Sequence, residues 1–378
     1  MRHLCLTLLL ALAAACTAGA PSAPPPQSAS AGTSQSAPSP GAAPTAGAAT
    51  SPPAASANPY QAPPGQAPIN VKAATCAVSG GFVHLYTAVD AGLFQQYGLN
   101  VEHVSISGSG PSLAAMSAGE IQFLYCAAEA TIPGLASGSD ARIVGSPLLG
   151  LPYVLLASAD VQSVPDLRGK TIAVSRPGQL NDRLARMTVE KFGLKPNEDV
   201  EIRPIGGGQP EGFQALVAGV AQATPVTPPL DAEGRKYELH VIYDMNNLGL
   251  PFVYSAVHAP NNLIRDNPQL VQKFVAAIAD AVYYTEKNPD AARAALRKVL
   301  DLQDEDALNS AYDAYAKKFV NRRLTTPLDA VQGTIDYARE QGTQVVKNAD
   351  DIVTNQFADD LDRSGFLQQL WGAELPPK

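Results

Sequence analysis

Apolar and polar positions follow two alternating patterns from residue 69 onward. Short runs that are mostly apolar, at 69–77, 101–106 and 121–127, predict buried strands. A span from about residue 82 instead places apolar side chains three or four positions apart, which predicts a helix. Strands that alternate with helices are typical of βα units around a mostly parallel sheet. The pattern therefore predicts an α/β fold.

The same cycle occurs a second time, roughly a hundred residues later. Residues 113–123 and 213–223 are similar: each starts with a helical tail that ends at Ala-Gly, and Gln122 or Gln222 stands three residues after that glycine. Two such units predict two similar lobes, and a cleft between two lobes is a place to bind a small molecule. The second unit comprises predicted strands at 171–175, 200–205 and 221–226 and predicted helices at 181–192 and up to 218.

Beyond about residue 250 the pattern becomes helical. Gly and Pro are scarce there, and residues that favour helices are common. The predicted helices are 267–288, 289–300, 305–319, 327–341 and 357–370.

The first residues have the pattern of an export signal. The apolar stretch from Leu4 to Ala15 is too short to span a bilayer and suits a secretory signal peptide over residues 1–15. Cys16 follows small residues that resemble a bacterial lipobox, in which the cysteine carries a lipid, although Ala13 stands where Leu is usual. Ordinary cleavage after Ala20, at an Ala-x-Ala site, is the alternative.

Residues 16–68 consist almost entirely of Ala, Pro, Ser, Gly, Thr and Gln, and no charged residue lies between Arg2 and Lys72. Such a segment has too few large apolar side chains to offset the entropy of ordering. We therefore expect a disordered linker between a lipid anchor and the folded part. A pro-segment that is cleaved away is the alternative.

The remaining composition restricts the class of partner. The chain has 378 residues and a net charge of −8, which is spread along the folded part without runs of one sign. The length left after the linker suffices for two lobes with cores of their own. Without a basic patch, nucleic-acid binding has no electrostatic support, so we expect none.

Two cysteines remain in the folded part, Cys76 and Cys126. Each is the sixth residue of a predicted strand, in the runs 71–76 and 121–126. If these strands are parallel neighbours, the two sulfur atoms lie side by side near the ends of the strands. A disulfide then suits an exported protein, whereas two small buried residues that never pair are the alternative.

Candidate ligand contacts follow from the rule that ligands bind beyond the carboxyl ends of parallel strands. Glycines there let backbone N–H groups approach a ligand, Phe82 offers a flat face, and a helix start after Ser107 suits an anionic or carbonyl group. The residues selected by this rule are Ser79, Gly80, Gly81, Phe82, Ser107, Gly108, Ser109, Ala128, Glu129, Ser175, Arg176 and Thr224.

The charged members of this set indicate opposite ligand charges. Glu129 would accept a hydrogen bond from an amine or a ring N–H, whereas Arg176 would bind a sulfonate, carboxylate or phosphate. Either side chain is also compatible with an ordinary solvated position on the surface. The pattern leaves open a mixed polar heterocycle or a zwitterion.

Motifs for catalysis are missing from the sequence. It contains no Gly-x-Ser-x-Gly, His-Glu-x-x-His or Cys-x-x-Cys, and its histidines have no metal-ligand spacing. We therefore expect no enzyme activity, no cofactor and no bound metal.

A set of short motifs, in a fixed order over roughly residues 69–340, resembles the periplasmic solute-binding proteins of bacterial ABC importers. The similarity is to the branch that serves sulfonates, nitrate, taurine and thiamine-pyrimidine precursors. Two features depart from that branch: Gln122 and Gln222 stand where Asp is common, and the single Trp371 lies outside the cleft-forming segments. The motifs are Asp90–Phe94, Gly98–Glu102, Ala118–Glu120 and Asp166–Val174, with a Gly-rich loop after the second.

The resemblance implies a type II periplasmic-binding-protein fold, with each lobe a mostly parallel sheet flanked by helices. Lobe one would comprise 69–157 plus 248–378 and lobe two 158–247, with hinges near 157–161 and 246–251.

These features together predict a monomeric, lipid-anchored protein on the extracytoplasmic face of the membrane. It would bind a small polar ligand (a sulfonate, a nitrate-like anion or a heterocyclic vitamin precursor) and deliver it to an ABC permease. A sensor or structural lipoprotein with the same fold and no transporter is the alternative.

Overall fold

The computed structural model describes residues 58–377. The predicted signal peptide, the lipidation at Cys16 and the linker up to residue 57 lie outside the described residues. Within the described part of the chain, no helix is both long and apolar enough to cross a membrane.

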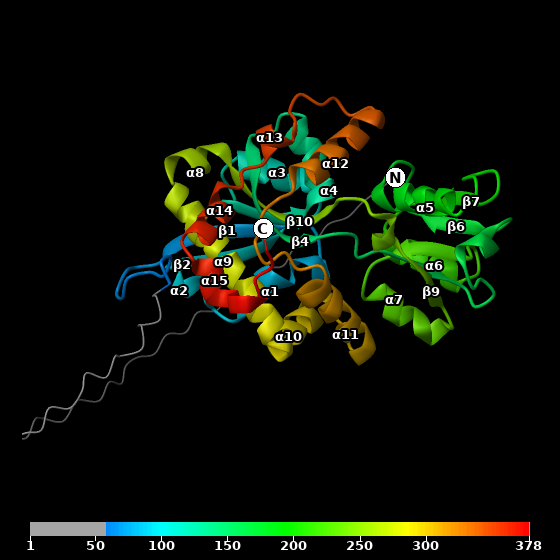
Figure 1. The fold of residues 1–378 in the computed structure, drawn as a ribbon, viewed down its shortest axis with the longest axis horizontal. Coiled ribbons are helices and arrows are strands. Elements are labelled where there is room, and N and C mark those ends of the chain that lie inside the picture. Colours follow the sequence, from blue (N-terminus) through cyan, green and yellow to red (C-terminus); the bar gives the residue numbers. More distant parts are fainter. Residues whose placement is uncertain (1–57, 378) are drawn as a thin grey trace, which may run out of the picture. The chain divides into compact units, whose positions relative to one another are not determined.

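Five strands form the sheet of lobe one, in the order β2-β1-β3-β10-β4. Figure 1 labels β1, β2, β4 and β10 of this sheet. β1 pairs in parallel with β2 and β3, whereas β10 is antiparallel to β3 and β4. The strands are β1 Ile69–Thr75, β2 Leu99–Ser105, β3 Phe123–Ala127, β4 Ala141–Leu149 and β10 Val253–Pro260. The helices between them are η1 Gly80–Phe82, α1 Val83–Asp90, α2 Leu93–Gln96, α3 Ser109–Ser117 and α4 Ala128–Ala136.

A second five-stranded sheet forms lobe two, in the order β7-β6-β8-β5-β9. Its parallel strands β6, β7 and β8 correspond to β1, β2 and β3, as the internal repeat predicts. The predicted two-lobed α/β fold is thereby confirmed. The strands are β5 Val154–Ala157, β6 Thr171–Val174, β7 Glu201–Pro204, β8 Ala223–Val226 and β9 His240–Asp244. The helices are η2 Val164–Leu167, α5 Leu180–Lys191, α6 Gln209–Val217, α7 Leu230–Glu233, η3 Gly234–Tyr237 and η4 Met245–Leu248.

The first crossover between the lobes lies earlier than the predicted 157–161. β5 pairs with β8 and β9, so residues 154–157 belong to lobe two, and the chain changes lobes at 150–153. The sequence analysis predicted no strand here and drew the end of lobe one at residue 157, because an apolar run has the same pattern whichever sheet it joins. The second crossover runs from β9 to β10 through η4.

The helices after β10 are shared between the two lobes. Leu270, Phe274 and other buried residues of α9 pack into the core of lobe one, where the centre of the Phe274 ring lies 3.8 Å from that of Phe123. Residues of α10, α11 and η5 instead join the core of lobe two. The elements are α8 Asn261–Asp266, α9 Pro268–Lys287, α10 Pro289–Leu300, α11 Glu305–Asp313, η5 Ala314–Lys318, α12 Leu328–Glu340, α13 Ala349–Ile352, α14 Gln356–Arg363, α15 Phe366–Trp371 and η6 Gly372–Glu374.

Residues 58–68, which the predicted boundary assigned to the disordered linker, contact the folded part of the chain. Tyr60 packs edge-on against Phe366, and its hydroxyl group donates to the carbonyl oxygen of Asp360 at 3.0 Å. Asn58 donates to the hydroxyl oxygen of Tyr97 at 3.2 Å. Asn58 and Tyr60 thus attach this segment to the folded part, and composition averaged over the segment does not show this.

Candidate functional site

A cavity of about 450 Å³ lies between the two lobes. Lobe one contributes α4 and α12 to its walls, and lobe two contributes the β6–α5 connection and the start of α6. Tyr153 and Phe252 line it from the two crossovers. A volume of this size, with aromatic side chains and a few polar groups, suits a small organic ligand.

Glu129 presents a carboxyl group at the lobe-one wall of the cavity. The sequence placed this residue in a loop, whereas the structure places it in the first turn of α4. Its Oε2 atom is buried and has no hydrogen-bond partner among residues 58–377. Burial raises the pKa of Glu129 to about 7, because the charged form loses its hydration.

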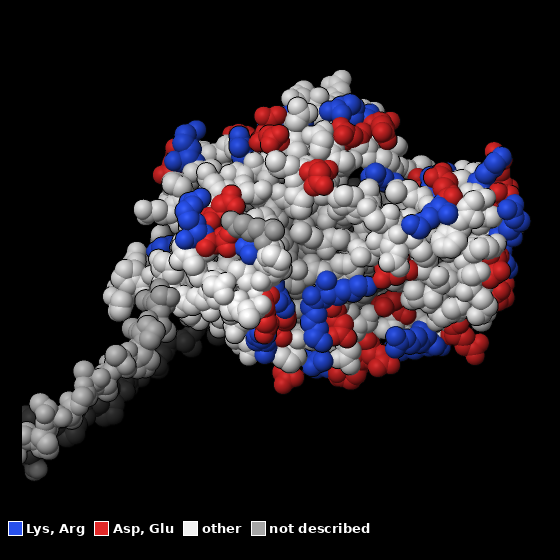
Figure 2. Space-filling model, in the orientation of Figure 1, with Lys and Arg blue, Asp and Glu red and all other residues white. Residues whose placement is uncertain are grey.

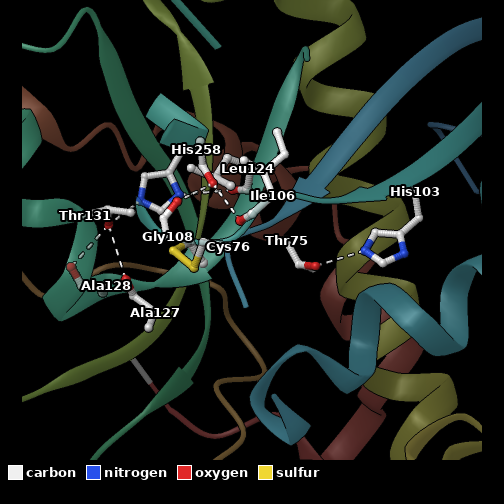
Figure 3. Close-up of a disulfide and its surroundings, with 12 residues drawn as sticks. Thr75, Cys76, His103, Ile106, Gly108, Leu124, Ala127, Ala128, Thr131 and His258 are labelled. Atoms are coloured by element: carbon white, nitrogen blue, oxygen red, sulfur yellow. Dashed lines mark hydrogen bonds between the residues drawn. A yellow bond between two sulfur atoms is a disulfide. The ribbon is translucent and has the colours of Figure 1, made fainter. Parts of the chain in front are cut away.

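The start of α4, the helix that carries Glu129, is held by the disulfide and the hydrogen bonds drawn in Figure 3. Cys76 and Cys126 form a disulfide between the ends of β1 and β3, and α4 begins two residues after Cys126. His258 on β10 donates from Nδ1 to the carbonyl oxygen of Leu124 at 3.0 Å, and its Nε2 lies 2.9 Å from Thr131 Oγ1. Burial lowers the pKa of His258 to about 4, so the ring is neutral and accepts from Thr131. These contacts fix the first turn of α4.

The lobe-two wall carries an unpaired amide oxygen. Asn181 is 6% exposed and donates from Nδ2 to Ser175 Oγ at 2.7 Å. Its Oδ1 atom is buried without a partner in the described residues. An unpaired buried acceptor costs about 1–3 kcal/mol, which a donor on a ligand would recover. Both Asn181 and Ser175 line the cavity.

Two further polar groups near the floor of the cavity are already paired. Gln209 accepts from the backbone N–H of Thr227 at 2.7 Å and donates to the Tyr153 hydroxyl oxygen at 3.2 Å. Burial raises the pKa of Tyr153 well above its usual value, with the nearby Glu129 carboxyl adding to the effect. Tyr153 therefore stays protonated and retains a hydroxyl hydrogen to donate.

One edge of the cavity is bridged by a contact between the lobes. Tyr337 on α12 donates to the carbonyl oxygen of Gly178 at 3.1 Å. The guanidinium of Arg183 on α5 lies 4.1 Å from the centre of the same ring. Such a cation–π contact is favourable where water is partly excluded.

The predicted loop Ser79–Phe82 does not line this cavity. A Cβ atom on Gly80 would meet the Tyr315 ring at 2.6 Å, and one on Gly81 would meet the Tyr254 ring at 2.5 Å. The glycines thus make room for two tyrosine rings of the protein itself. Phe82 is 1% exposed and packs against Tyr125 in the core of lobe one.

Of the other predicted contacts, the structure brings only Glu129 and Ser175 to the cavity. Thr224 is buried and donates to the carbonyl oxygen of Ala173 at 3.0 Å. The remaining residues lie elsewhere: Ser107, Gly108 and Arg176 are exposed, Ser109 is the first residue of α3, and Ala128 is buried.

Several lining residues were missed by the sequence analysis. Tyr153 and Phe252 lie in the crossovers, and Tyr337 lies on a helix far along the chain, where no local motif marks a site. Asn181 is the second residue of α5 and Gln209 the first of α6, and each lies a few residues after a strand of the second sheet. Extending the strand-end rule by a few residues into those helices would have included both.

The charge distribution adds little to the site. On the face shown in Figure 2, acidic and basic side chains intermix and neither sign forms a large patch. Among residues 58–377, no three His, Cys, Asp or Glu side chains are grouped in a way that could hold a metal ion.

Comparisons with known proteins relate the chain to one family. The family model described as NMT1/THI5 like matches residues 80–292. A Brucella abortus protein named as a candidate binding protein is 25% identical over 209 residues, 54% of this chain and 63% of that relative. The chain thus matches less than two thirds of the length of that curated relative. The riboflavin-binding protein RibY of Chloroflexus aurantiacus is 30% identical over 146 residues, 37% of this chain and 40% of RibY.

A solved structure shares the fold. The periplasmic aliphatic sulphonate-binding protein SsuA of Escherichia coli matches with a TM-score of 0.60 at 19% identity. The match covers 75% of this chain and 93% of SsuA. At this identity the similarity establishes the two-lobed fold and leaves the ligand open.

Proposed function

Because the chain belongs to the NMT1/THI5-like family, we propose that it is a solute-binding protein that delivers a small polar organic ligand to an ABC permease. The observation that carries the proposal is the cavity of about 450 Å³ whose walls come from both lobes and both crossovers. A site divided in this way is assembled only when the lobes are together.

The proposed mechanism is closure of the lobes around the ligand. A ligand that contacts Glu129 on α4 and Ser175 after β6 binds the closed form more tightly than the open one. Its binding energy then shifts the population toward the closed form, which a permease would recognise. The crossovers at 150–153 and 245–252 are the segments about which the lobes would rotate.

The chemistry of the cavity supports binding without catalysis. The relatives reported above are named as binding proteins. The Glu129 carboxyl interacts electrostatically with the Tyr153 hydroxyl group, and no Cys, Lys or His residue is among the described residues that line the cavity. We propose that a bound ligand leaves unchanged.

The proposed location is the extracytoplasmic face of the membrane, with Cys16 carrying a lipid. The export signal over residues 1–15 and the binding-protein fold support this location. Fractionation of cells that express the Cys16→Ala variant tests the anchor. Release of the variant from the membrane fraction is expected, and continued retention would contradict lipidation.

The function is tested by thermal unfolding of the purified full chain with a panel of ligands. The panel comprises propanesulfonate, taurine, nitrate, 4-amino-2-methylpyrimidine and riboflavin. We expect at least one class to raise the Tm in a concentration-dependent way, since binding to the folded state alone stabilises it. Mass spectrometry of the recovered ligand should show no product. A Tm unchanged by every member would overturn the proposal.

A further inference from the structure

A second cavity, of about 400 Å³, lies on the other face of the first crossover. We call it the rear cavity, and the one described above the front cavity. Tyr153 lines the front cavity, whereas its neighbours Pro152 and Val154 line the rear one. Side chains that alternate in this way point to opposite faces of the backbone, so the crossover runs between the two cavities. In Figure 1, α5 and α12 of the front cavity lie toward the top, and α7 and α11 of the rear cavity toward the bottom.

One wall of the rear cavity is formed by α11 and η5, and the other by lobe two. Apolar side chains of α10, α11 and η5 pack against lobe two, but this segment is attached to lobe one at both ends. It directly follows α9, and Lys298 of α10 pairs with Asp90 of α1 at 2.8 Å. Just after η5, the carbonyl oxygen of Phe319 accepts from the backbone N–H of Leu149 in β4 at 2.9 Å. The segment therefore moves with lobe one.

Polar contacts join the same segment to lobe two across the rear cavity. Ser310 of α11 donates from Oγ to the Asp231 carboxylate of α7, whose two oxygens both lie at 2.8 Å. Lys318 of η5 pairs with Asp244 of β9 at 2.7 Å. All four residues line the rear cavity, so these contacts connect its two walls.

A rotation of the lobes about the crossovers moves the front and rear faces in opposite senses. When the front cavity opens, α11 approaches α7, and when it closes the two helices separate. The contact between Ser310 and Asp231 is formed at the same lobe angle as the contact of α12 with Gly178. Opening of the front cavity therefore displaces the rear contact and makes the rear cavity smaller.

We propose that the rear contact between α11 and α7 holds the lobes at the closed angle, and that the rear cavity is the space into which α11 moves when the ligand site opens. The inference rests on the lobe closure proposed above and concerns what regulates it. The contact touches no ligand. It sets the fraction of molecules that are closed before a ligand arrives, and through that fraction the apparent affinity for any ligand that prefers the closed form.

The first test removes the contact from either wall. Ser310→Ala and Asp231→Ala should each raise the ratio of open to closed molecules about fivefold, because each removes a half-exposed hydrogen bond to a charged group. Small-angle X-ray scattering of the full chain without ligand should show a larger radius of gyration. Ser158→Ala is the matched control, since its hydroxyl group donates to Asp160 at 2.7 Å within lobe two. It should scatter like the wild type.

The second test fills the rear cavity. Asp313 lines this cavity at an exposed position of α11, so Asp313→Trp leaves less space for α11 to approach lobe two. Added to Ser310→Ala, it should reverse the increase in the radius of gyration. Asp290→Trp, at an exposed position of α10 outside the cavity, is the control and should leave the increase unchanged. A general loss of stability would not produce changes of opposite sign at one face.

Scattering of Ser310→Ala and Asp231→Ala that matches the wild type would overturn the inference. A double variant with Asp313→Trp that scatters like Ser310→Ala alone would also overturn it, because the rear cavity would then not narrow on opening. If one variant does not fold, its partner from the other wall tests the same contact. The ligand panel is a separate test: a Tm unchanged by every ligand would overturn the solute-binding function without altering these scattering differences.

Discussion

Glu129 is a carboxyl group whose environment disfavours its charge. Burial raises its pKa from 4.5 to about 7. The groups that face it are Tyr153 from the first crossover and Tyr254 from β10, both of which stay neutral because burial also raises their pKa values. Between pH 4.5 and 7 the folded protein therefore holds a proton that the unfolded chain has released.

This difference predicts that Glu129 lowers the stability of the protein as pH rises. The free energy of unfolding should fall between pH 5 and pH 8, relative to Glu129→Gln, by an upper limit of about 3 kcal/mol. Glu129 keeps some exposure, so the effect should be smaller than this limit. Urea unfolding of both proteins at the two pH values measures it. If the free energies of unfolding of wild type and Glu129→Gln differed by the same amount at both pH values, the raised pKa of Glu129 would be contradicted.

At the scale of single residues, local pattern and final role often diverge. Gly80 and Gly81 indicate close approach of another group, and the structure agrees, but the groups are the rings of Tyr315 and Tyr254. The sequence cannot say whether a glycine admits a ligand or a distant side chain, because the two require the same absence of a Cβ atom.

The strands β1 and β3 carry the disulfide that lies beneath α4. Their parallel register pairs Thr75 with Tyr125, which places Cys76 opposite Cys126. Each cysteine is the sixth residue of its run in the sequence, so the observed register agrees with the predicted pairing of these strands. Element positions of this kind were largely readable from the sequence, because a buried parallel strand is a short apolar run with a turn at each end.

Removal of the disulfide should destabilise the protein. The bond closes a separation of 50 residues, for which chain entropy gives about 4 kcal/mol. The double variant Cys76→Ala with Cys126→Ala should lose about that much free energy of unfolding in urea. Wild-type protein unfolded in the presence of a reductant serves as the control and should show the same loss. Equal midpoints with and without reductant would show that the bond does not stabilise the fold.

Helix boundaries show where element prediction stops working. A single helix was predicted over 357–370, but Gly365 adopts a φ of +78° and separates α14 from α15. Conversely, α4 was not predicted, although it carries Glu129. Its sequence contains Pro133 and Gly134, which favour a loop, and packing against α12 overrides that preference.

For the whole molecule, the contact between α12 and α5 spans the two lobes. Tyr337→Phe removes the hydroxyl group that binds the Gly178 carbonyl oxygen and keeps the ring that contacts Arg183. Loss of one such bond, about 1 kcal/mol, should raise the ratio of open to closed molecules roughly fivefold without ligand. Small-angle X-ray scattering should show a larger radius of gyration. Tyr237→Phe, at an exposed tyrosine of lobe two, is the control. Identical scattering from Tyr337→Phe and wild type would mean that this contact does not hold the lobes together.

The sequence alone predicted the two-lobed α/β fold, the parallel strands of both sheets and the similarity of the two lobes, whereas β4, β5, β9 and β10 were not predicted. Hydrophobic periodicity and an internal repeat can both be recognised from the order of residues along the chain, without knowledge of which segments meet in space. The approximate ends of the strands, and with them Glu129 and Ser175, were determined in the same way.

Only the tertiary structure decided which residues meet at the cavity. It brought Tyr337, more than two hundred positions from Glu129, to the same site and assigned 154–157 to lobe two. It also showed that Glu129 Oε2 and Asn181 Oδ1 have no hydrogen-bond partner among residues 58–377, whereas tyrosine rings pack against the glycines of the loop Ser79–Phe82. Hydrogen-bond satisfaction and packing are properties of contacts between distant segments. No local pattern encodes them, so they exist only once the chain has folded.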